Sequence, residues 1–282
     1  MKMTGTLYIV ATPIGNLEDL TFRAARILAE VNVIAAEDTR HSRNLLRHYG
    51  ISTPLISYYR ERENSRAKEL VARLLAGESI AIVSDAGTPG IADPGAALVR
   101  KARAAGIAVV PIPGASALTA AVSVAGFTSS EFLFLGFPPA KSGSRRKWLE
   151  TLTIYPWPLV MYESPRRVAD LLTDMLKLWG DRPAMLAREL TKTFEETAQS
   201  TLSSLLGHDI TLAQRGEYVV IVWPMVAPDK GGDDVDGLLR WYRDQGEVSL
   251  KDACHRLAAD LNLPRTEIYQ RALTIWREKD DL

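Results

Sequence analysis

Short apolar runs alternate along this chain with longer amphipathic segments, and the alternation predicts an α/β protein. Runs of four or five mostly apolar residues predict buried strands. They lie at residues 7–11, 33–36, 79–83, 107–110, 132–135, 159–162, 184–187 and 218–222. Helical spacing of apolar residues predicts the intervening helices. These lie at residues 20–31, 43–49, 63–75, 118–125, 145–152 and 165–178, with a further helix beginning near Pro94.

Turn-forming residues divide this pattern into three parts. Residues 126–131 (GFTSSE) separate two strand-rich regions, and residues 226–236 are rich in glycine and aspartate. We therefore expect α/β domains at 1–126 and 127–226, followed by a linker and helical extension at 227–282. Three helices are expected in the extension, and two of them, 250–261 and 265–276, are spaced like a helix-turn-helix. Acidic and basic residues of the extension nearly balance. The extension is therefore expected to be either an RNA-contacting module or a small helical packing module.

Three strands of the first domain run into loops rich in proline and glycine. The loops are TPIGN (12–16), SDAGTPGIADPG (84–95) and PIPGASA (111–117). Glycine allows a ligand to approach the backbone closely, and ligands of open α/β sheets bind at the carboxyl ends of strands. Neither the dinucleotide nor the P-loop glycine pattern is present, and the three loops contain no lysine. The loops thus indicate a small ligand with little phosphate, or simply tight turns with aspartate caps.

Seven segments together resemble one known family. They are ATPIGNL (11–17), AAEDTRHS (35–42), SDAGTPGIADPG (84–95), PIPGASA (111–117), GFPPAK (136–141), YESPRR (162–167) and ARELTKTFEE (187–196). In this order they are similar to the ribosomal RNA small subunit methyltransferase I family of the tetrapyrrole methylase superfamily. The resemblance spans about residues 5–225. It implies S-adenosylmethionine in a cleft between two α/β domains, a homodimer, and methylation of a cytidine 2′-hydroxyl in the decoding region of 16S rRNA.

The resemblance also implies which residues bind the cofactor. They are Pro13, Ile14, Asp85, Gly87, Thr88, Ser116, Ala117, Tyr162 and Ala187. Asp85 is expected either to pair with the methionine ammonium or to cap loop amides. Tyr162 and Ala187 are expected to flank the adenine.

Basic residues cluster after several predicted strands, where they could neutralise RNA phosphates. The candidates are Arg40, Arg43, Arg145, Arg146, Lys147, Arg166, Arg167 and Lys192. Taken singly, each cluster is also typical of a solvated helix face. Several clusters at one sheet edge favour a common RNA-binding face.

Three carboxylates are candidates for the general base, each beside an arginine at a strand end: Asp38, Glu163 and Glu189. A neighbouring arginine lowers the pKa of a carboxyl group and so weakens it as a base. The carboxylates are therefore alternatively expected to orient Arg40, Arg166 or Arg188 around the ribose-phosphate, and for Glu189 the orienting role is favoured.

Composition limits the remaining possibilities. The chain has 282 residues and a formal net charge of zero, and it contains no apolar run of membrane-spanning length. The N-terminus lacks a signal-peptide pattern, and the lone Cys254 suits a reducing compartment such as the cytoplasm. The four histidines show no metal-ligand spacing, so we expect no metal. Two alternatives stay open: a tetrapyrrole methylase, and a non-catalytic RNA-binding factor in ribosome assembly.

Overall fold

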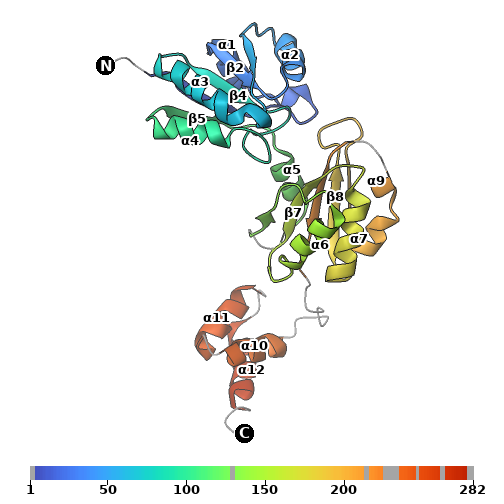
Figure 1. Cartoon of the computed structure of the whole chain (residues 1–282). Coiled ribbons are helices and arrows are strands. Elements are labelled where there is room, and N and C mark those ends of the chain that lie inside the picture. The colour runs from blue at the N-terminus through green and yellow to red at the C-terminus, as the bar shows by residue number, and fades with distance from the viewer. Residues whose placement is uncertain are drawn as a thin grey trace. The chain divides into compact units, whose positions relative to one another are not determined.

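The computed structural model describes residues 4–127, 131–212, 216–224, 235–245, 248–260 and 264–277 (Figure 1). The chain divides into two compact units, residues 1–225 and residues 226–282. The proposed linker lies mostly outside the described residues, as do positions 262 and 263 of the break between the last two helices. The division of the first unit at residue 126 stays our proposal.

A parallel five-stranded sheet forms the first half of the first unit. Its strands are β1 (Thr6–Val10), β2 (Val33–Ala36), β3 (Leu55–Ser57), β4 (Ile80–Val83) and β5 (Ala108–Ile112), in the order β3-β2-β4-β1-β5. β2 and β4 are buried at every position, as expected for central strands of a parallel sheet. The strand predictions hold for β1, β2, β4 and β5. β3 was not predicted, because it has three residues and is only half-buried at the sheet edge.

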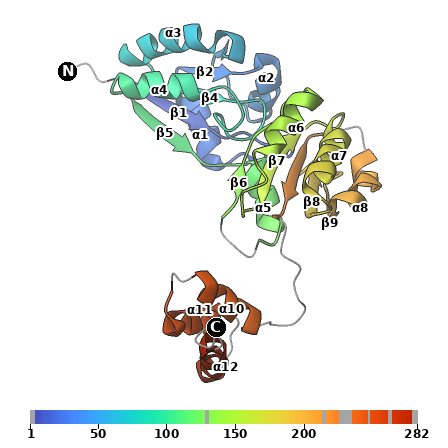
Figure 2. The same ribbon diagram turned by 60° about the horizontal axis from the view of Figure 1, so that its bottom comes forward.

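Helices cover both faces of this sheet (Figure 2). α1 (Phe22–Glu30) and α2 (Thr39–His48) pack on one face, and α3 (Glu63–Leu75) and α4 (Ala96–Ala104) pack on the other. Two short 3-10 helices, η1 (Leu17–Asp19) and η2 (Arg60–Arg62), precede α1 and α3. With both faces covered, only the strand ends remain to form a binding site.

A second five-stranded sheet follows. It contains β6 (Leu133–Phe134), β7 (Leu159–Glu163), β8 (Pro183–Arg188), β9 (Glu196–Thr201) and β10 (Tyr218–Val222), in the order β6-β7-β10-β8-β9. Only β6 and β7 pair in parallel; the other neighbours are antiparallel. β9 was not predicted, because its sequence ETAQST is polar and largely exposed.

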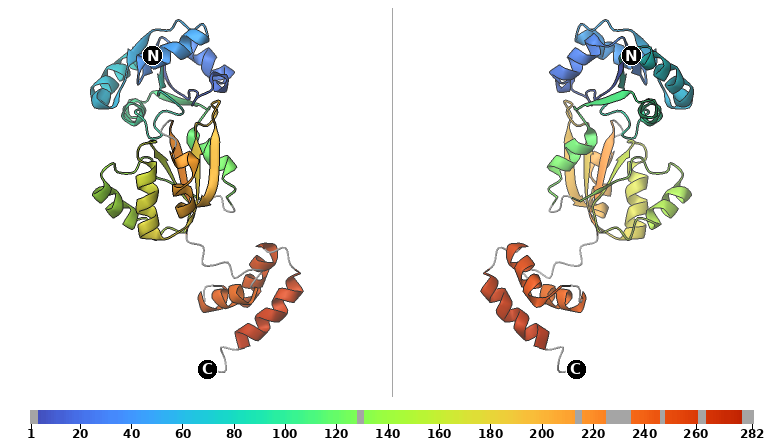
Figure 3. Two further views of the ribbon diagram at one scale, coloured as in Figure 1. Left: turned by 90° about the vertical axis from the view of Figure 1, so that its right-hand side faces the viewer. Right: turned by 90° about the vertical axis from the view of Figure 1, so that its left-hand side faces the viewer.

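The second sheet also carries helices on both faces (Figure 3). α6 (Ser142–Glu150), α7 (Val168–Trp179) and α8 (Leu202–Leu206) pack on one face, and α9 (Asp209–Leu212) follows α8. α5 (Ala117–Val124) packs on the other face through Leu118 and Ala121. α5 leaves the first sheet and packs on the second, so its N-terminus lies where the two halves meet.

Side chains of β7 alternate between the two faces of the second sheet. Leu159 and Met161 belong to the core beneath α7, whereas Val160 and Tyr162 belong to the core beneath α5. Glu163, the next residue, is fully buried and pairs with Arg167 at the start of α7. The side chains of Tyr162 and Glu163 therefore lie on opposite faces of the second sheet.

The second unit consists of three packed helices, as predicted. α10 (Val235–Gln245), α11 (Leu250–Asp260) and α12 (Arg265–Arg277) share a core of Leu239, Cys254, Leu257, Ile268 and Ile275. Cys254 is fully buried in this core, and burial raises the pKa of its thiol, as is typical of a packing residue. Among the described residues, no helix combines the length and the apolar character needed to cross a membrane.

Candidate active site

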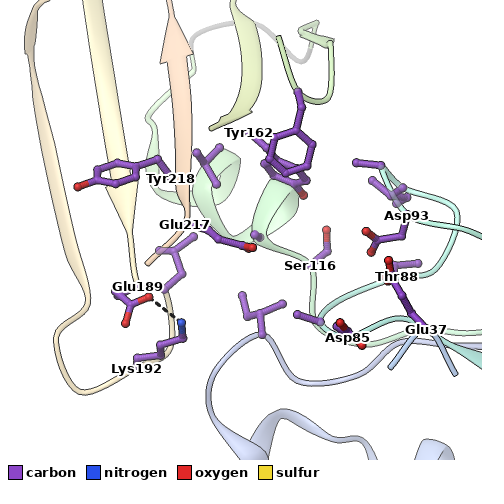
Figure 4. Close-up of a pocket in the computed structure, with 18 residues that line it drawn as sticks. Glu37, Asp85, Thr88, Asp93, Ser116, Tyr162, Glu189, Lys192, Glu217 and Tyr218 are labelled. Atoms are coloured by element: carbon purple, nitrogen blue, oxygen red, sulfur yellow. Dashed lines mark hydrogen bonds and ion pairs between the residues drawn. The ribbon is translucent and has the colours of Figure 1, made fainter. Parts of the chain in front are cut away.

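Four strand ends of the first sheet meet at the rim of one pocket (Figure 4). Because β1, β2, β4 and β5 are parallel, their carboxyl ends lie at one edge. The loops after them contribute Ile14, Glu37, Asp85, Ala86, Thr88, Ile91, Ala92, Asp93, Ser116 and Ala117. Five of these residues are among the cofactor ligands expected from the family resemblance: Ile14, Asp85, Thr88, Ser116 and Ala117.

The second sheet closes the pocket from the other side (Figure 4). It contributes Phe137, Tyr162, Glu189, Leu190, Lys192, Glu217, Tyr218 and Val219. β10 runs antiparallel to β7 and β8, so its beginning lies beside their ends. The pocket thus belongs to the facing edges of two sheets within the first unit.

Backbone bonds hold the first-sheet loops together. Thr12 and Gly87 exchange two hydrogen bonds, with N···O distances of 2.9 and 3.0 Å, and the Thr88 hydroxyl donates to the Ala115 carbonyl at 3.3 Å. Gly87 has φ +78°, and a Cβ there would lie 3.4 Å from Cγ2 of Ile14. Gly87 therefore lies against Ile14 behind the wall of the pocket, and neither Gly87 nor Pro13, both predicted as cofactor ligands, lines the pocket itself.

Asp85 both lines the pocket and holds a neighbouring loop. Its Oδ1 accepts a hydrogen bond from the Asp38 amide at 3.0 Å. The backbone after β2 is thereby fixed so that Glu37 lines the pocket and Asp38 does not. Capping a loop amide, one of the two roles expected of Asp85, is confirmed, and its second carboxylate oxygen remains for a ligand.

The pocket is strongly acidic. Five carboxylates line it, from Glu37, Asp85, Asp93, Glu189 and Glu217, against one ammonium, that of Lys192. Burial, reinforced by the nearby carboxylates, raises the pKa of both Glu37 and Asp93. Within the described part of the chain, no three acidic, histidine or cysteine side chains converge as metal ligands. The excess of carboxylates suits a cationic ligand, and it repels phosphate.

An aromatic group forms the wall opposite the acidic loops. The Tyr162 hydroxyl accepts a hydrogen bond from the Leu118 amide at 3.0 Å, at the start of α5. The rings of Phe134 and Phe137 pack on Tyr162 at centroid distances of 5.0 and 5.5 Å. Burial raises the pKa of the Tyr162 phenol, so the ring stays neutral. A flat, neutral aromatic wall suits the stacking of a planar heterocycle.

The loop after β8 places an ion pair at the pocket. Nζ of Lys192 lies 2.6 Å from Oε1 of Glu189. Glu189 (φ 51°), Thr191 (φ 67°) and the pocket residue Ala92 (φ 65°) have left-handed backbone conformations. Such conformations cost free energy in residues other than glycine and concentrate at functional sites. The Thr191 hydroxyl also accepts from the Asn16 amide at 3.2 Å, which ties this loop to the first sheet.

Several predicted catalytic residues lie elsewhere, and those predictions are corrected. Asp38 caps α2 and bonds to Arg40, which lowers the pKa of its carboxyl group. Glu163 points to the α7 face, as the β7 alternation requires. Arg188 pairs with Glu196 on β9 at 2.8 Å. Ala187, predicted beside the adenine, is buried in the core beneath α5 and does not line the pocket.

Arg145 is the clearest correction among the predicted RNA contacts. Its Nη2 lies 2.7 Å from Oδ2 of Asp174, and the two side chains are 3 % and 9 % exposed. The guanidinium therefore joins α6 to α7 inside the protein instead of facing RNA. Arg167 is likewise paired, with Glu163 at 2.6 Å. Lys192 lines the pocket. The remaining candidates, Arg40, Arg43, Arg146, Lys147 and Arg166, are exposed.

Ten lining residues were absent from the predicted site, and the polar or aromatic ones among them are Glu37, Asp93, Phe137, Glu217 and Tyr218. Glu37 directly follows a buried strand, and Asp93 lies in the glycine-rich loop, so strand-end position was a usable signal for both. Phe137 lies in the GFPPAK segment. Glu217 and Tyr218 lie at the start of β10, and only its antiparallel pairing brings them to this edge.

Comparison with known sequences gives a consistent assignment. Residues 6–206 match the family of Tetrapyrrole (Corrin/Porphyrin) Methylases. The Ribosomal RNA small subunit methyltransferase I of Neisseria meningitidis serogroup B is 48% identical over 98% of this chain and 95% of its own length. The protein of the same name from Pseudomonas aeruginosa is 45% identical over 95% of this chain and 97% of its own length.

Solved structures share the fold at low identity. Uroporphyrin-III C-methyl transferase from Thermus thermophilus, complexed with S-adenyl homocysteine, has a TM-score of 0.56 and 19% identity over 78% of this chain and 97% of that one. A conserved hypothetical protein from Aeropyrum pernix K1 has a TM-score of 0.62 and 17% identity over 99% of this chain and 97% of that one. These matches confirm the predicted tetrapyrrole methylase fold. The chain therefore belongs to the tetrapyrrole methylases and, among them, to the ribosomal RNA small subunit methyltransferase I family.

Proposed function

We propose that this protein transfers a methyl group from S-adenosylmethionine to the 2′-hydroxyl of a cytidine ribose in 16S rRNA, in the decoding region of the small subunit. The observation that carries the proposal is the acidic pocket at the facing edges of the two sheets. S-adenosylmethionine has a sulfonium and an ammonium against one carboxylate, so five carboxylates and one ammonium suit its net positive charge.

The lining residues fit the parts of this cofactor. Asp85, Asp93 and Glu37 provide acceptors for its ammonium and compensation for its charge. Tyr162 and Phe137 provide an aromatic surface for the adenine, and Ile14 and Ala117 provide apolar contact. The names of the curated relatives support methylation of small-subunit ribosomal RNA.

The reaction asks little acid–base chemistry of the protein. When bound, S-adenosylmethionine would supply the methyl group to the ribose oxygen and leave as S-adenosylhomocysteine, and the protein would have to accept the hydroxyl proton. Glu189 is the one candidate base of the sequence analysis that lines the pocket. We propose that Glu189 accepts the proton of the ribose hydroxyl. Lys192 holds the Glu189 carboxylate in position through the 2.6 Å contact. Such proton transfer contributes about 10²–10⁴-fold to the rate.

Charge also constrains how RNA approaches. Phosphates are repelled by the pocket, so the ribose must enter while its phosphates stay outside. Arg40, Arg43, Arg146, Lys147 and Arg166 are exposed and provide basic groups for those phosphates. We propose these five residues as the RNA-binding set, in place of the eight expected from sequence.

A comparison of three methyl acceptors, each supplied separately, tests the proposal. The purified protein is incubated with methyl-labelled S-adenosylmethionine and one of three acceptors: small subunits from cells lacking this gene, naked 16S rRNA, or a tetrapyrrole. We expect label in 16S rRNA and none in the tetrapyrrole. Label in the tetrapyrrole alone would replace the proposal with a tetrapyrrole methylase. Absence of cofactor binding would replace it with a non-catalytic RNA-binding factor.

Two further expectations belong to this proposal. We propose a homodimer in the cytoplasm, as the family resemblance implies. Sedimentation velocity of the purified protein at micromolar concentration measures the oligomeric state, and a mass near twice 31.1 kDa is expected for the dimer. A single species at the monomer mass would contradict it.

A further inference from the structure

A second hollow adjoins the acidic pocket and shares its wall. Ile14 and Ser116 line both, while consecutive residues of one loop divide between them, Thr191 in the hollow and Lys192 in the pocket. The hollow is also lined by Asp19, Thr21, Gly114, Ala115, Thr119, Ala120 and Ser123. We call it the Asp19 hollow. A group bound there lies directly beside an occupant of the acidic pocket.

The hydroxyl groups of the hollow offer a defined set of donors and acceptors. The hydroxyls of Thr119 and Ser123 donate to the carbonyls of Ser116 and Ala120, at 3.2 and 2.7 Å, so their lone pairs remain for a ligand. The hydroxyl oxygens of Thr21 and Thr191 accept from backbone amides at 3.1 and 3.2 Å, so their protons remain. The hollow therefore presents hydroxyl acceptors on α5 and hydroxyl donors on the two facing loops.

Asp19 adds a carboxylate to the lining of the hollow. It ends η1 and is partly buried, and its Oδ2 is shielded from solvent without a hydrogen-bond partner among the described residues. Leaving a buried acceptor unpaired costs free energy, most of all when it is charged. By contrast, Glu18, the preceding residue, is exposed and lines neither the pocket nor the hollow.

We propose that the Asp19 hollow binds the base of the nucleotide being methylated, and that Asp19 selects cytosine by accepting a hydrogen bond from its 4-amino group. The inference rests on the proposed function and identifies the part of the site that chooses the base. A carboxylate can only accept, and the cytosine amino group is the donor that aspartate reads in nucleic acids. Uracil has a carbonyl oxygen at the same position, which a carboxylate repels.

The rest of the hollow suits the same base. Cytosine N3 and O2 are acceptors, and the hydroxyl protons of Thr21 and Thr191 match them. The cavity volume of about 410 Å³ falls within the range of roughly 300–1,000 Å³ typical of small-ligand sites. A nucleotide with its base in the hollow would have its ribose at the shared wall of Ile14 and Ser116. From this wall the 2′-hydroxyl faces the pocket that contains Glu189.

The test compares cytidine and uridine at the methylated position. Small subunits are reconstituted from transcribed 16S rRNA carrying either nucleotide, and kcat/KM is measured for wild type, Asp19→Asn and Glu18→Gln. We expect Asp19→Asn to lower kcat/KM on cytidine at least about tenfold, because a neutral amide oxygen is a weaker acceptor than a carboxylate and the amide NH₂ can instead donate to the uracil oxygen. The ratio of uridine to cytidine methylation should rise by a similar factor. Glu18→Gln, the neighbouring matched control, should change neither value.

Cofactor affinity separates a local effect from misfolding. Asp19 lies outside the acidic pocket, so Asp19→Asn should bind S-adenosylmethionine as wild type does. A second variant, Thr119→Val, removes a hydroxyl acceptor and should raise KM for the cytidine subunit several-fold at unchanged cofactor affinity. An unchanged cytidine-to-uridine ratio in a folded, cofactor-binding Asp19→Asn variant would overturn the inference alone. Failure of the wild type to methylate cytidine at all would instead overturn the proposed function.

Discussion

Glu189 and Lys192 form an ion pair of 2.6 Å at the pocket, on a loop whose backbone is left-handed at Glu189. The position of the carboxylate depends on the absence of two side chains. A Cβ at Gly216 would lie 2.3 Å from Oε1 of Glu189, and a Cβ at Gly15 would lie 2.3 Å from Cγ of Lys192. Both partners are therefore held by close packing as well as by charge.

Glu189→Gln tests the role of this carboxylate. Removing the base should lower kcat by about 10²–10⁴-fold, while cofactor affinity changes little, because the pocket keeps its other carboxylates. Asp38→Asn is the matched control. Asparagine caps a helix as well as aspartate does, and Asp38 lies outside the pocket, so near-normal turnover is expected. A large loss of kcat in Asp38→Asn together with near-normal turnover in Glu189→Gln would instead identify Asp38 as the general base.

Gly15→Ala should act through Lys192. The added methyl group displaces the lysine chain, so kcat should fall, and we expect Lys192→Met to lower it to a similar extent. Since both changes remove the same contact, the double variant should be hardly slower than either single one. Multiplicative effects in a double-mutant cycle would show that Gly15 acts by another route.

The raised pKa values of Glu37 and Asp93 predict opposite effects on stability and on binding. A carboxyl group with a raised pKa holds its proton more tightly in the folded protein than in the unfolded chain. Stability is therefore lost as pH rises above the ordinary values of 4.5 and 3.8, where the unfolded groups ionise. Glu37→Gln and Asp93→Asn should raise the melting temperature at pH 7, and the gain should shrink toward pH 4.

The same two variants should bind S-adenosylmethionine more weakly, because each removes a charge that faces the cation. Melting curves and calorimetric titrations at pH 4, 5.5 and 7 measure both effects. Asp181→Asn serves as a control of opposite sign: hydrogen bonds from Ser203 and Thr201 lower the pKa of the exposed Asp181, so this change should not raise the melting temperature at pH 7. A variant that lost stability at pH 7 would contradict the account of an electrostatically costly pocket.

Arg145 and Arg146 are neighbours with opposite expected behaviour. Arg145→Ala leaves Asp174 buried and unpaired, so the free energy of unfolding should fall by about 3–5 kcal/mol. The double variant of Arg146 and Lys147 to alanine should keep its stability but bind 16S rRNA more weakly, with a shallower salt dependence. Denaturant unfolding and filter binding at several salt concentrations distinguish the two. Weaker RNA binding without loss of stability in Arg145→Ala would restore it as an RNA contact.

Much of the fold could be predicted from sequence because burial leaves a pattern. β2, β4 and β10 are buried at every position, and each was predicted as a strand within one residue of its bounds. β3 and β9 were missed because edge strands lack that pattern: one has three half-buried residues, and the other is polar. For these, only pairing with a neighbouring strand determines the structure.

The site was predictable where it follows strand ends and not where it depends on side-chain direction. Ile14, Asp85, Thr88, Ser116 and Ala117 follow their strands directly and line the pocket. By contrast, Glu163 and Tyr162 are adjacent in sequence, and only the face of β7 on which each lies separates a buried ion pair from a pocket wall. The burial of Arg145 likewise depends on Asp174, 29 residues away, whose position sequence spacing does not give.

The position of the transferred methyl group tests the central claim most directly. RNA labelled by the wild-type protein is hydrolysed with alkali, which needs a free 2′-oxygen beside each phosphate that it cleaves. The account predicts that all label stays in one alkali-resistant dinucleotide beginning with cytidine. Gly87→Arg, which forces a long side chain into the wall behind Ile14, should give no label. Label released in mononucleotides would place the methyl group on a base and contradict the account.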